Sequence, residues 1–158
     1  MKIALIFLSV LVLSPGSDNN IIRFKVNGAP VKTSVWNIAP FTGIKGITGI
    51  NVTSNMHEDG RTVSFNINGN TVGTYPLKAG LRASGESGIA YGSYRPDYMK
   101  AMMNNYRFVS GEFVITSIDP KKHLFNCTFH GRATNGRGEA IEITDGAVIN
   151  AELKPASH

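Results

Sequence analysis

Side chains that commonly bind metal ions are few and far apart in this sequence. They are four histidines and one cysteine, at His57, His123, His130, His158 and Cys127. A metal site needs several such donors, or carboxylates, at one point. On a regular strand His123 and His130 point to opposite faces, and His123 and Cys127 lie about 13 Å apart, so neither pair can share an ion. We therefore predict no metal site and no cofactor.

The sequence also shows no motif of a catalytic nucleophile. The turn that exposes a nucleophilic serine reads G-x-S-x-G, whereas this chain has only Gly85-Glu86-Ser87-Gly88 in a stretch typical of a loop. No glycine loop with a phosphate-binding lysine occurs. We predict that the protein is not an enzyme. A hydrolase whose site is assembled only in three dimensions is retained as the second alternative.

A cluster of aromatic residues is the strongest candidate for binding. Three tyrosines lie beside an arginine and a methionine-rich segment. Aromatic rings with polar tips are frequent at recognition surfaces, and methionine repacks easily around a ligand. We predict a ligand-binding surface formed by Tyr91, Tyr94, Arg95, Tyr98 and Met102. Its ligand would be a glycan, a peptide, a small apolar molecule or a protein partner, and packing in the core or at its rim is the alternative role.

The elements that must position these residues are indicated by a period of two. Apolar and polar residues alternate in 21–26, 61–68 and 147–153, which is typical of antiparallel strands with one buried and one solvated face. The pattern predicts nine or ten strands, near 21–27, 30–37, 46–54, 61–68, 71–77, 88–94, 106–118 (with a possible bend at Gly111), 123–134, 139–144 and 147–153.

Turn residues separate these strands. Type I′ hairpins need positive φ at both central residues, which Asn, Asp and Gly tolerate best. Such dipeptides are Asn27-Gly28, Asp59-Gly60, Asn68-Gly69, Asn135-Gly136 and Asp145-Gly146. Short strands with regularly spaced turns predict an all-β fold, in the first place an antiparallel β-sandwich. A lipocalin-like up-and-down β-barrel is the alternative.

One segment, 96–105, breaks the strand pattern. Pro96 and Asp97 suit a first helical turn. Met99, Met102 and Met103 follow at a spacing that places them on one helical face. The segment predicts one short helix or lid, which either plugs an open end of the β core or covers a ligand site.

Length and charge restrict the classes of partner. A chain of 158 residues has the size of one domain. Its net charge is +5, but the basic residues are scattered and only Lys121 and Lys122 are adjacent. Nucleic-acid-binding proteins concentrate positive charge on one face or stripe, so we predict no nucleic-acid partner.

The N-terminus has the pattern of a secretion signal. Lys2 precedes an apolar run over 3–13, which stops at Ser14-Pro15-Gly16-Ser17. The run is shorter than the roughly 20 residues that span a bilayer. We predict a signal peptide over 1–17, a single β domain over 18–158, no transmembrane helix, and export to the periplasm or cell surface. In that oxidising environment Cys127 has no internal partner, and on a strand face shared with Phe125 and Phe129 it should be buried.

Several strand and turn motifs together resemble a known family. They are the G-x-F-x-I-T-x-x-D pattern of Gly111–Asp119, the later Ile143-Thr144-Asp145-Gly146, and the opening Phe24-Lys25-Val26-Asn27-Gly28 followed by Trp36. The chain resembles small exported or lipid-anchored β-domain proteins of Bacteroidetes that have no assigned function, most closely over 106–153. The resemblance implies an exported β domain and no catalytic residues. Unlike the lipid-anchored members, this chain has no cysteine after the leader, which argues against a lipid anchor.

These features together favour an exported, non-catalytic binding or interaction module of the cell envelope. A lipocalin-like carrier of a small apolar ligand is the first alternative.

Cleavage of the leader is directly testable. When the full chain is expressed with an intact secretion pathway, the exported protein should begin at Ser17 or Asp18, because small residues stand at the cleavage site. Intact-mass spectrometry of the exported fraction measures this. Protein that keeps Met1 and stays in the cytoplasm would contradict the signal peptide.

Overall fold

A computed structural model describes residues 21–43, 46–54, 61–80, 85–97 and 104–154. The predicted leader, 1–17, lies outside the described residues. Nine strands and no α-helix occur in the described part, and every pairing between strands is antiparallel, so the all-β, antiparallel prediction is confirmed. The strands are β1 (Ile21–Val26), β2 (Ala29–Thr42), β3 (Thr48–Ser54), β4 (Thr62–Ile67), β5 (Gly73–Pro76), β6 (Ala90–Arg95), β7 (Tyr106–Asp119), β8 (Leu124–Thr134) and β9 (Ala140–Glu152).

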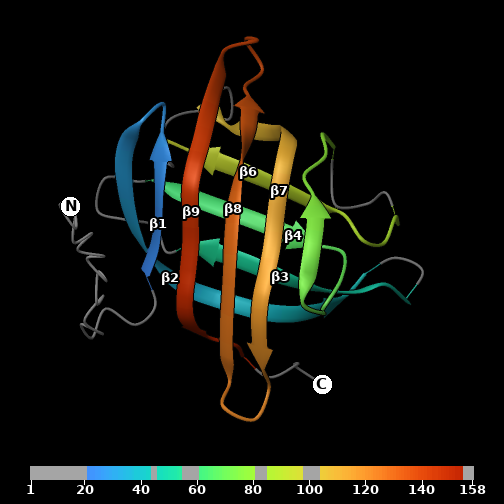
Figure 1. Ribbon diagram of the computed structural model, residues 1–158. Helices are drawn as coiled ribbons and strands as arrows, with labels where there is room; N and C mark the ends of the chain where they lie inside the picture. Colours follow the sequence, from blue (N-terminus) through green and yellow to red (C-terminus); the bar gives the residue numbers. More distant parts are fainter. Residues whose placement is uncertain (1–20, 44–45, 55–60, 81–84, 98–103, 155–158) are drawn as a thin grey trace, which may run out of the picture.

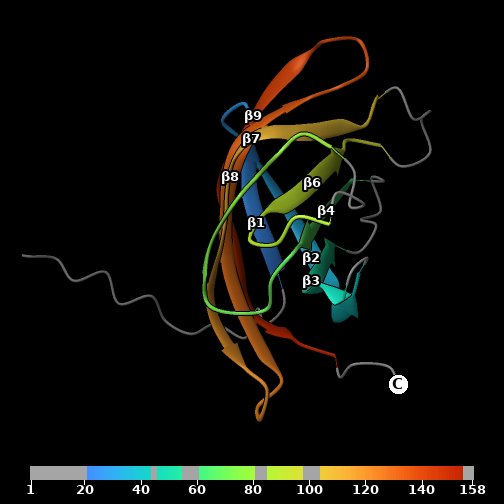
Figure 2. The same cartoon turned by 90° about the vertical axis from the view of Figure 1, so that its right-hand side faces the viewer.

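The strands form one continuous sheet that curls into a half-barrel. Their order is β5-β7-β6-β4-β3-β2-β1-β9-β8, and β8 pairs back with β7. In Figure 1, β1, β9, β8 and β7 run side by side in one layer, and β6, β4 and β3 run across behind them. Figure 2 shows the curled sheet from the side. The fold therefore has two facing layers, as in a sandwich. Most successive strands are paired as in an up-and-down barrel, but β4 pairs with β6 and β5 pairs with β7.

Two long strands belong to both layers. β2 pairs first with β1 and then, from Val35, with β3. β7 pairs with β8 along most of its length but with β6 only at Tyr106 and Arg107. At Gly111, where a bend in β7 was expected, φ is +121° and a Cβ would lie 2.2 Å from the carbonyl oxygen of His130. Only glycine allows β7 and β8 to approach so closely with this backbone conformation.

The space between the layers is filled by aromatic rings in the described structure. Phe65 of β4 contacts Phe108, Phe113 and Phe129, with ring centroids 5.3, 4.9 and 4.7 Å away. Gly92 of β6 lies against this cluster, and a Cβ there would stand 2.6 Å from Cδ1 of Phe65. The alternation in 61–68 correctly places Phe65 on the inner face, and the missing side chain of Gly92 makes room for its ring.

The first predicted hairpin is present. Asn27 and Gly28 have φ of +48° and +80°, and Val26 pairs with Ala29, so the turn has two residues. The Asn27 Oδ1 also accepts a hydrogen bond of 2.9 Å from the Glu142 amide. This contact ties the β1–β2 hairpin to β9.

The predicted hairpin at Asp145-Gly146 is wrong. Asp145 does have a positive φ, +54°, but β9 continues through it from Ala140 to Glu152 instead of forming two strands. The pairing with β8 changes register here, between Phe129 and Gly131. The left-handed residue therefore forms a β-bulge. Because β1 and β8 pair with β9 on both sides of this point, the strand cannot turn back on itself.

The expected helix or lid over 96–105 stays a prediction, because 98–103 lie outside the described residues. Pro96 and Asp97 follow the end of β6 without helical structure, and Asn105 directly precedes β7.

Cys127 of β8 is buried, as predicted, with 1% of its surface exposed. Burial raises the pKa of its thiol well above the ordinary value, because the thiolate would lose its hydration.

The thiol should therefore be unreactive in the folded protein. At about pH 8, Ellman's reagent should not label the native chain, because the thiolate is the reacting form. Unfolding in guanidinium should release one reactive thiol, and the chain contains no other cysteine to confuse the count. Fast stoichiometric labelling of the native protein would contradict the buried position.

Candidate functional site

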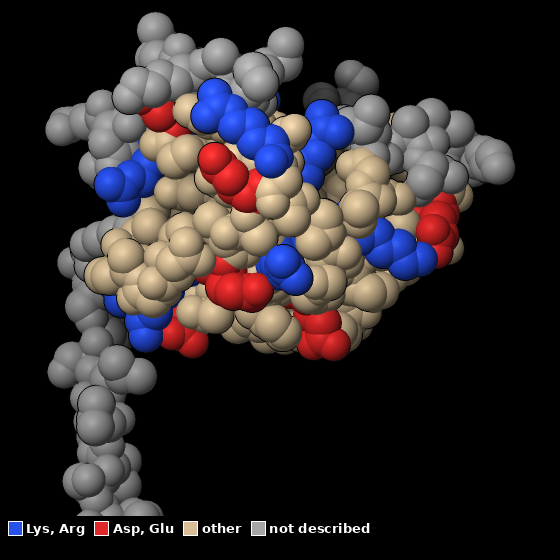
Figure 3. Space-filling view, turned by 90° about the horizontal axis from the view of Figure 1, so that it is seen from above, with Lys and Arg blue, Asp and Glu red and all other residues tan. Residues whose placement is uncertain are grey.

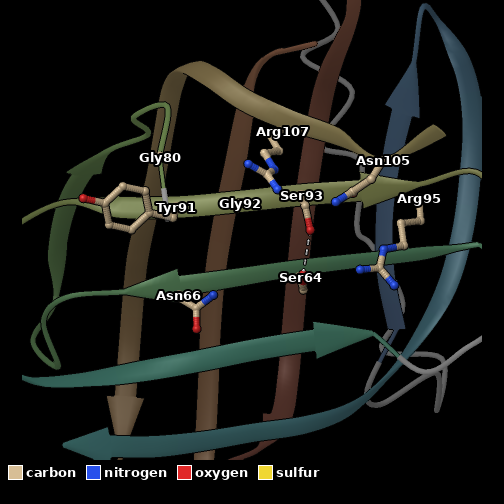
Figure 4. Close-up of a pocket in the computed structure, with 9 residues that line it drawn as sticks. All are labelled: Ser64, Asn66, Gly80, Tyr91, Gly92, Ser93, Arg95, Asn105 and Arg107. Carbon is tan, nitrogen blue, oxygen red and sulfur yellow. Dashed lines mark hydrogen bonds between the residues drawn. The ribbon is translucent and has the colours of Figure 1, made fainter. Parts of the chain in front are cut away.

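A polar pocket lies on the outer face of the β4–β6 layer. Its volume is about 240 Å³, and it is drawn in Figure 4. Drug-sized pockets have about 300–1,000 Å³, so this one is smaller than a typical drug-binding pocket. The lining residues come from β4, β6, the start of β7 and the loop after β5: Ser64, Asn66, Gly80, Tyr91, Gly92, Ser93, Arg95, Asn105 and Arg107.

Strand alternation explains the polar lining. In β4 the apolar residues are buried, so Ser64 and Asn66 point outward. Antiparallel pairing places Ser64 opposite Ser93 and Asn66 opposite Tyr91. The two serine hydroxyls form a hydrogen bond of 3.0 Å (Figure 4). The floor of the pocket is thus a pleated surface of hydroxyl and amide groups.

In the described structure, two acceptors near the pocket are buried and have no partner. The side-chain oxygen Oδ1 of Asn105 is buried and accepts no hydrogen bond. The same is true of Asn51 on β3, which stands opposite the pocket residue Asn66. A buried polar atom without a hydrogen bond costs about 1–3 kcal/mol.

Two arginines contribute the charge of the pocket. Arg107 of β7 is paired directly with Ser93, and Arg95 lies two residues beyond Ser93 on the same face of β6. In Figure 4, Arg95 and Tyr91 stand toward opposite ends of β6, with Arg107 between them. None of the nine lining residues is acidic.

Tyr91 borders the pocket and is mostly covered. Only 6% of its surface is exposed. Gly80 lies beside its ring, since a Cβ on Gly80 would be 3.2 Å from Cε1 of Tyr91. The small residue leaves this end of the pocket open.

The start of β7 is held by a contact on its other side. Tyr106 donates a hydrogen bond of 3.2 Å to Glu139 in the β8–β9 hairpin. Burial and this bond raise the pKa of Tyr106. Within that hairpin, Asn135 donates to the same Glu139 carboxylate at 2.7 Å and accepts from the amides of Arg137 and Glu139. These bonds fix the segment that carries Asn105 and Arg107.

The structure separates the residues predicted as a binding surface. Tyr91 and Arg95 line the pocket. Tyr94 faces the core, where its ring meets Phe24 edge-on at 5.7 Å. Tyr98 and Met102 lie outside the described residues. The predicted surface therefore stays a prediction, with two of its members at this pocket.

Most of the pocket was not identified from the sequence. Ser64 and Asn66 were visible as the polar positions of an alternating strand, but that pattern is typical of any solvated face. No local sequence pattern identifies Ser93, Asn105 or Arg107 as residues of a site. Their proximity arises because β6 pairs with β4 on one side and β7 on the other.

A second, apolar depression of about 210 Å³ lies on β1 and β2. Phe24, Pro30 and Val31 supply its apolar surface. At its rim the Lys25 ammonium lies 2.8 Å from the Asp145 carboxylate, which raises the pKa of Lys25 through the hydrogen bond and the opposite charge.

Two other kinds of feature are absent from the described residues. No group of three His, Cys, Asp or Glu side chains there lies close enough to hold a metal ion. No helix among them is long and apolar enough to cross a membrane. Seen from above, acidic and basic side chains are interspersed (Figure 3).

No family model, no curated protein and no solved structure matches this chain. The resemblance to the Bacteroidetes family therefore stays a prediction.

The position of Tyr94 leads to a stability prediction. Tyr94→Ala should lower the free energy of unfolding by about 3–5 kcal/mol, as for other large aromatic residues truncated in a core. Guanidinium denaturation measures this. Thr128→Ala, on an exposed position of β8, is the control and should change stability by no more than about 0.5 kcal/mol. If Tyr94→Ala were as stable as the wild type, Tyr94 would not be a core residue and would again be a candidate for ligand binding.

Proposed function

We propose that this protein is an exported, non-catalytic binding module of the cell envelope, and that its polar pocket holds a glycan. The observation that carries the proposal is the pocket on β4, β6 and β7, lined by hydroxyl, amide and guanidinium groups.

The lining matches the hydrogen-bonding chemistry of sugars. Sugar hydroxyls both donate and accept, and so do Ser64 and Ser93. Asn66 offers a donor and an acceptor, and Asn105 adds a second amide to the lining. The two arginines add donors only. A ligand that lacked hydroxyl groups would leave much of this surface unsatisfied.

A binding role agrees with the types of side chain present. None of the nine lining residues is a histidine, a cysteine or a carboxylate, which are the usual general bases and strong nucleophiles. The serine pair has no base among these residues that could activate it. The hydrolase alternative therefore gains no support from this pocket.

The carrier alternative gains little support from the interior. A carrier of an apolar ligand needs room between the layers, and in the described structure the Phe65 cluster occupies that space. The apolar depression on β1 and β2 is on a different part of the sheet and is bordered by charged groups. The polar pocket is therefore the better supported binding site.

A panel of oligosaccharides tests the proposal. The panel contains neutral hexose, N-acetylhexosamine and hexuronate oligomers, and binding is measured by isothermal titration calorimetry. We expect at least one class to bind. The double variant Asn66→Ala/Ser93→Ala should bind about tenfold more weakly, because each lost neutral hydrogen bond contributes about 0.5–1.5 kcal/mol.

Thr128→Ala is the matched control, since it removes a hydroxyl from the outer face of β8, away from the pocket. Binding of no class, or equal binding by the double variant and the wild type, would refute the proposal.

A further inference from the structure

The chain has three Asn-Gly dipeptides, and the fold leaves the asparagine of one of them open to solvent. They are Asn27-Gly28, Asn68-Gly69 and Asn135-Gly136. Asn27 is exposed, whereas only 4% of the surface of Asn68 and 8% of that of Asn135 is exposed. An asparagine before glycine can lose its side-chain nitrogen to attack by the next backbone nitrogen, which no Cβ shields. The three sites therefore share one covalent chemistry and differ in their surroundings.

The nucleophile at the exposed site, the backbone nitrogen of Gly28, is unobstructed. Gly28 has a φ of +80°, and a Cβ built on it would meet no atom within 4 Å. The hydrogen bond from the turn to β9 comes from its neighbour, because the Asn27 amide donates to the Glu142 carbonyl at 2.8 Å. In the described structure the Gly28 amide donates no hydrogen bond. It has no partner there to lose before it reacts.

The electrophile, the side-chain amide carbon of Asn27, is activated by a contact with β9. Its Oδ1 oxygen accepts a hydrogen bond of 2.9 Å from the Glu142 backbone amide. Negative charge develops on this oxygen when a nucleophile adds to the carbon, and a positioned backbone N–H stabilises such charge. The Nδ2 nitrogen of Asn27, which must leave, makes no hydrogen bond in the described structure.

The other two asparagines are held at the group that must leave. Asn68 donates from Nδ2 to the Glu86 carbonyl at 2.6 Å, and Asn135 donates from Nδ2 to the Glu139 carboxylate at 2.7 Å. Both residues are also shielded from water. Each would have to break its bond and open locally before its amide could react.

We infer that Asn27 is a site of spontaneous deamidation in the folded protein. The Gly28 nitrogen gives its proton to hydroxide or water and bonds to the side-chain carbon of Asn27. The bond from that carbon to Nδ2 then breaks, and the departing nitrogen takes up a proton and leaves as ammonia. Water opens the resulting cyclic imide at either carbonyl, which gives aspartate or isoaspartate at position 27. The net reaction consumes water and releases ammonia, and nothing is oxidised or reduced.

The two products act differently on the hairpin. Aspartate keeps the backbone length and an oxygen that can accept from the Glu142 amide. Isoaspartate leads the backbone through the former side chain, which adds a methylene group to a turn where Val26 pairs with Ala29. Because this turn joins β1 to β2 beside β9 (Figure 1), isoaspartate should loosen the contact between the hairpin and β9. Ageing of the protein should therefore lower its melting temperature.

Peptide mapping of protein aged at mildly alkaline pH tests the inference. Trypsin separates the sites, since it releases 26–32, 62–78 and 133–137, and fragment mass spectra locate each amide that has become an acid. In the folded protein, Asn27 should react at least about tenfold faster than Asn68 and Asn135, which must first break hydrogen bonds and open. In guanidinium the three sites should react at similar rates, because glycine follows each of them.

The variant Asn27→Gly is the matched control. It removes the reacting amide, and Gly-Gly still suits a type I′ turn. Its melting temperature should stay constant during ageing that lowers that of the wild type. If Asn27 reacted as slowly as Asn68 and Asn135 in the folded protein, the inference would be overturned. An equal loss of melting temperature in Asn27→Gly would overturn the effect assigned to isoaspartate.

Discussion

The packing of Phe65 between the two layers is the constraint on which the rest of the structure depends. Its ring touches Phe108, Phe113 and Phe129, which come from both strands of the opposing β7–β8 hairpin. Gly92 on the neighbouring strand has no side chain to obstruct it. Truncating such a phenylalanine typically costs about 3–5 kcal/mol, a large share of the 5–15 kcal/mol that stabilises a whole domain. The cluster therefore fixes β4 and β6 against the other layer.

The same constraint determines which side chains of β4 and β6 face outward. Because the aromatic rings fill the space between the layers, β4 and β6 present their other faces outward, and these faces carry Ser64, Asn66, Ser93 and Arg95. Substitutions on an outer face usually change stability by less than about 0.5 kcal/mol. The polar side chains on these outer faces therefore contribute little to the stability of the fold. Core and site occupy opposite faces of the same two strands.

Rigid connections support this arrangement at the ends of the strands. The β8–β9 hairpin is braced by Asn135 and Glu139, and Tyr106 joins it to the start of β7. Asp119 accepts hydrogen bonds from the amides of Lys121 and Lys122 at the opposite hairpin. Such local bonds hold long strands in register where they leave the sheet. They also keep Asn105 and Arg107 in place, since both belong to the segment that Tyr106 anchors.

The sequence by itself determined the strands, their buried faces and the first hairpin, because a period of two and an Asn-Gly turn are local properties of the chain. Asp145-Gly146 has the same turn chemistry as Asn27-Gly28, yet it forms a bulge, since paired strands on both sides keep β9 extended. Likewise Tyr91 and Tyr94 look alike in sequence, but one borders the pocket and the other packs in the core. Only the tertiary structure decided that β6 lies between β4 and β7, and so brought Asn66, Ser93 and Arg107 together. Strand order depends on contacts between distant parts of the chain, and alternation shows which face a residue occupies but not which strand will lie beside it.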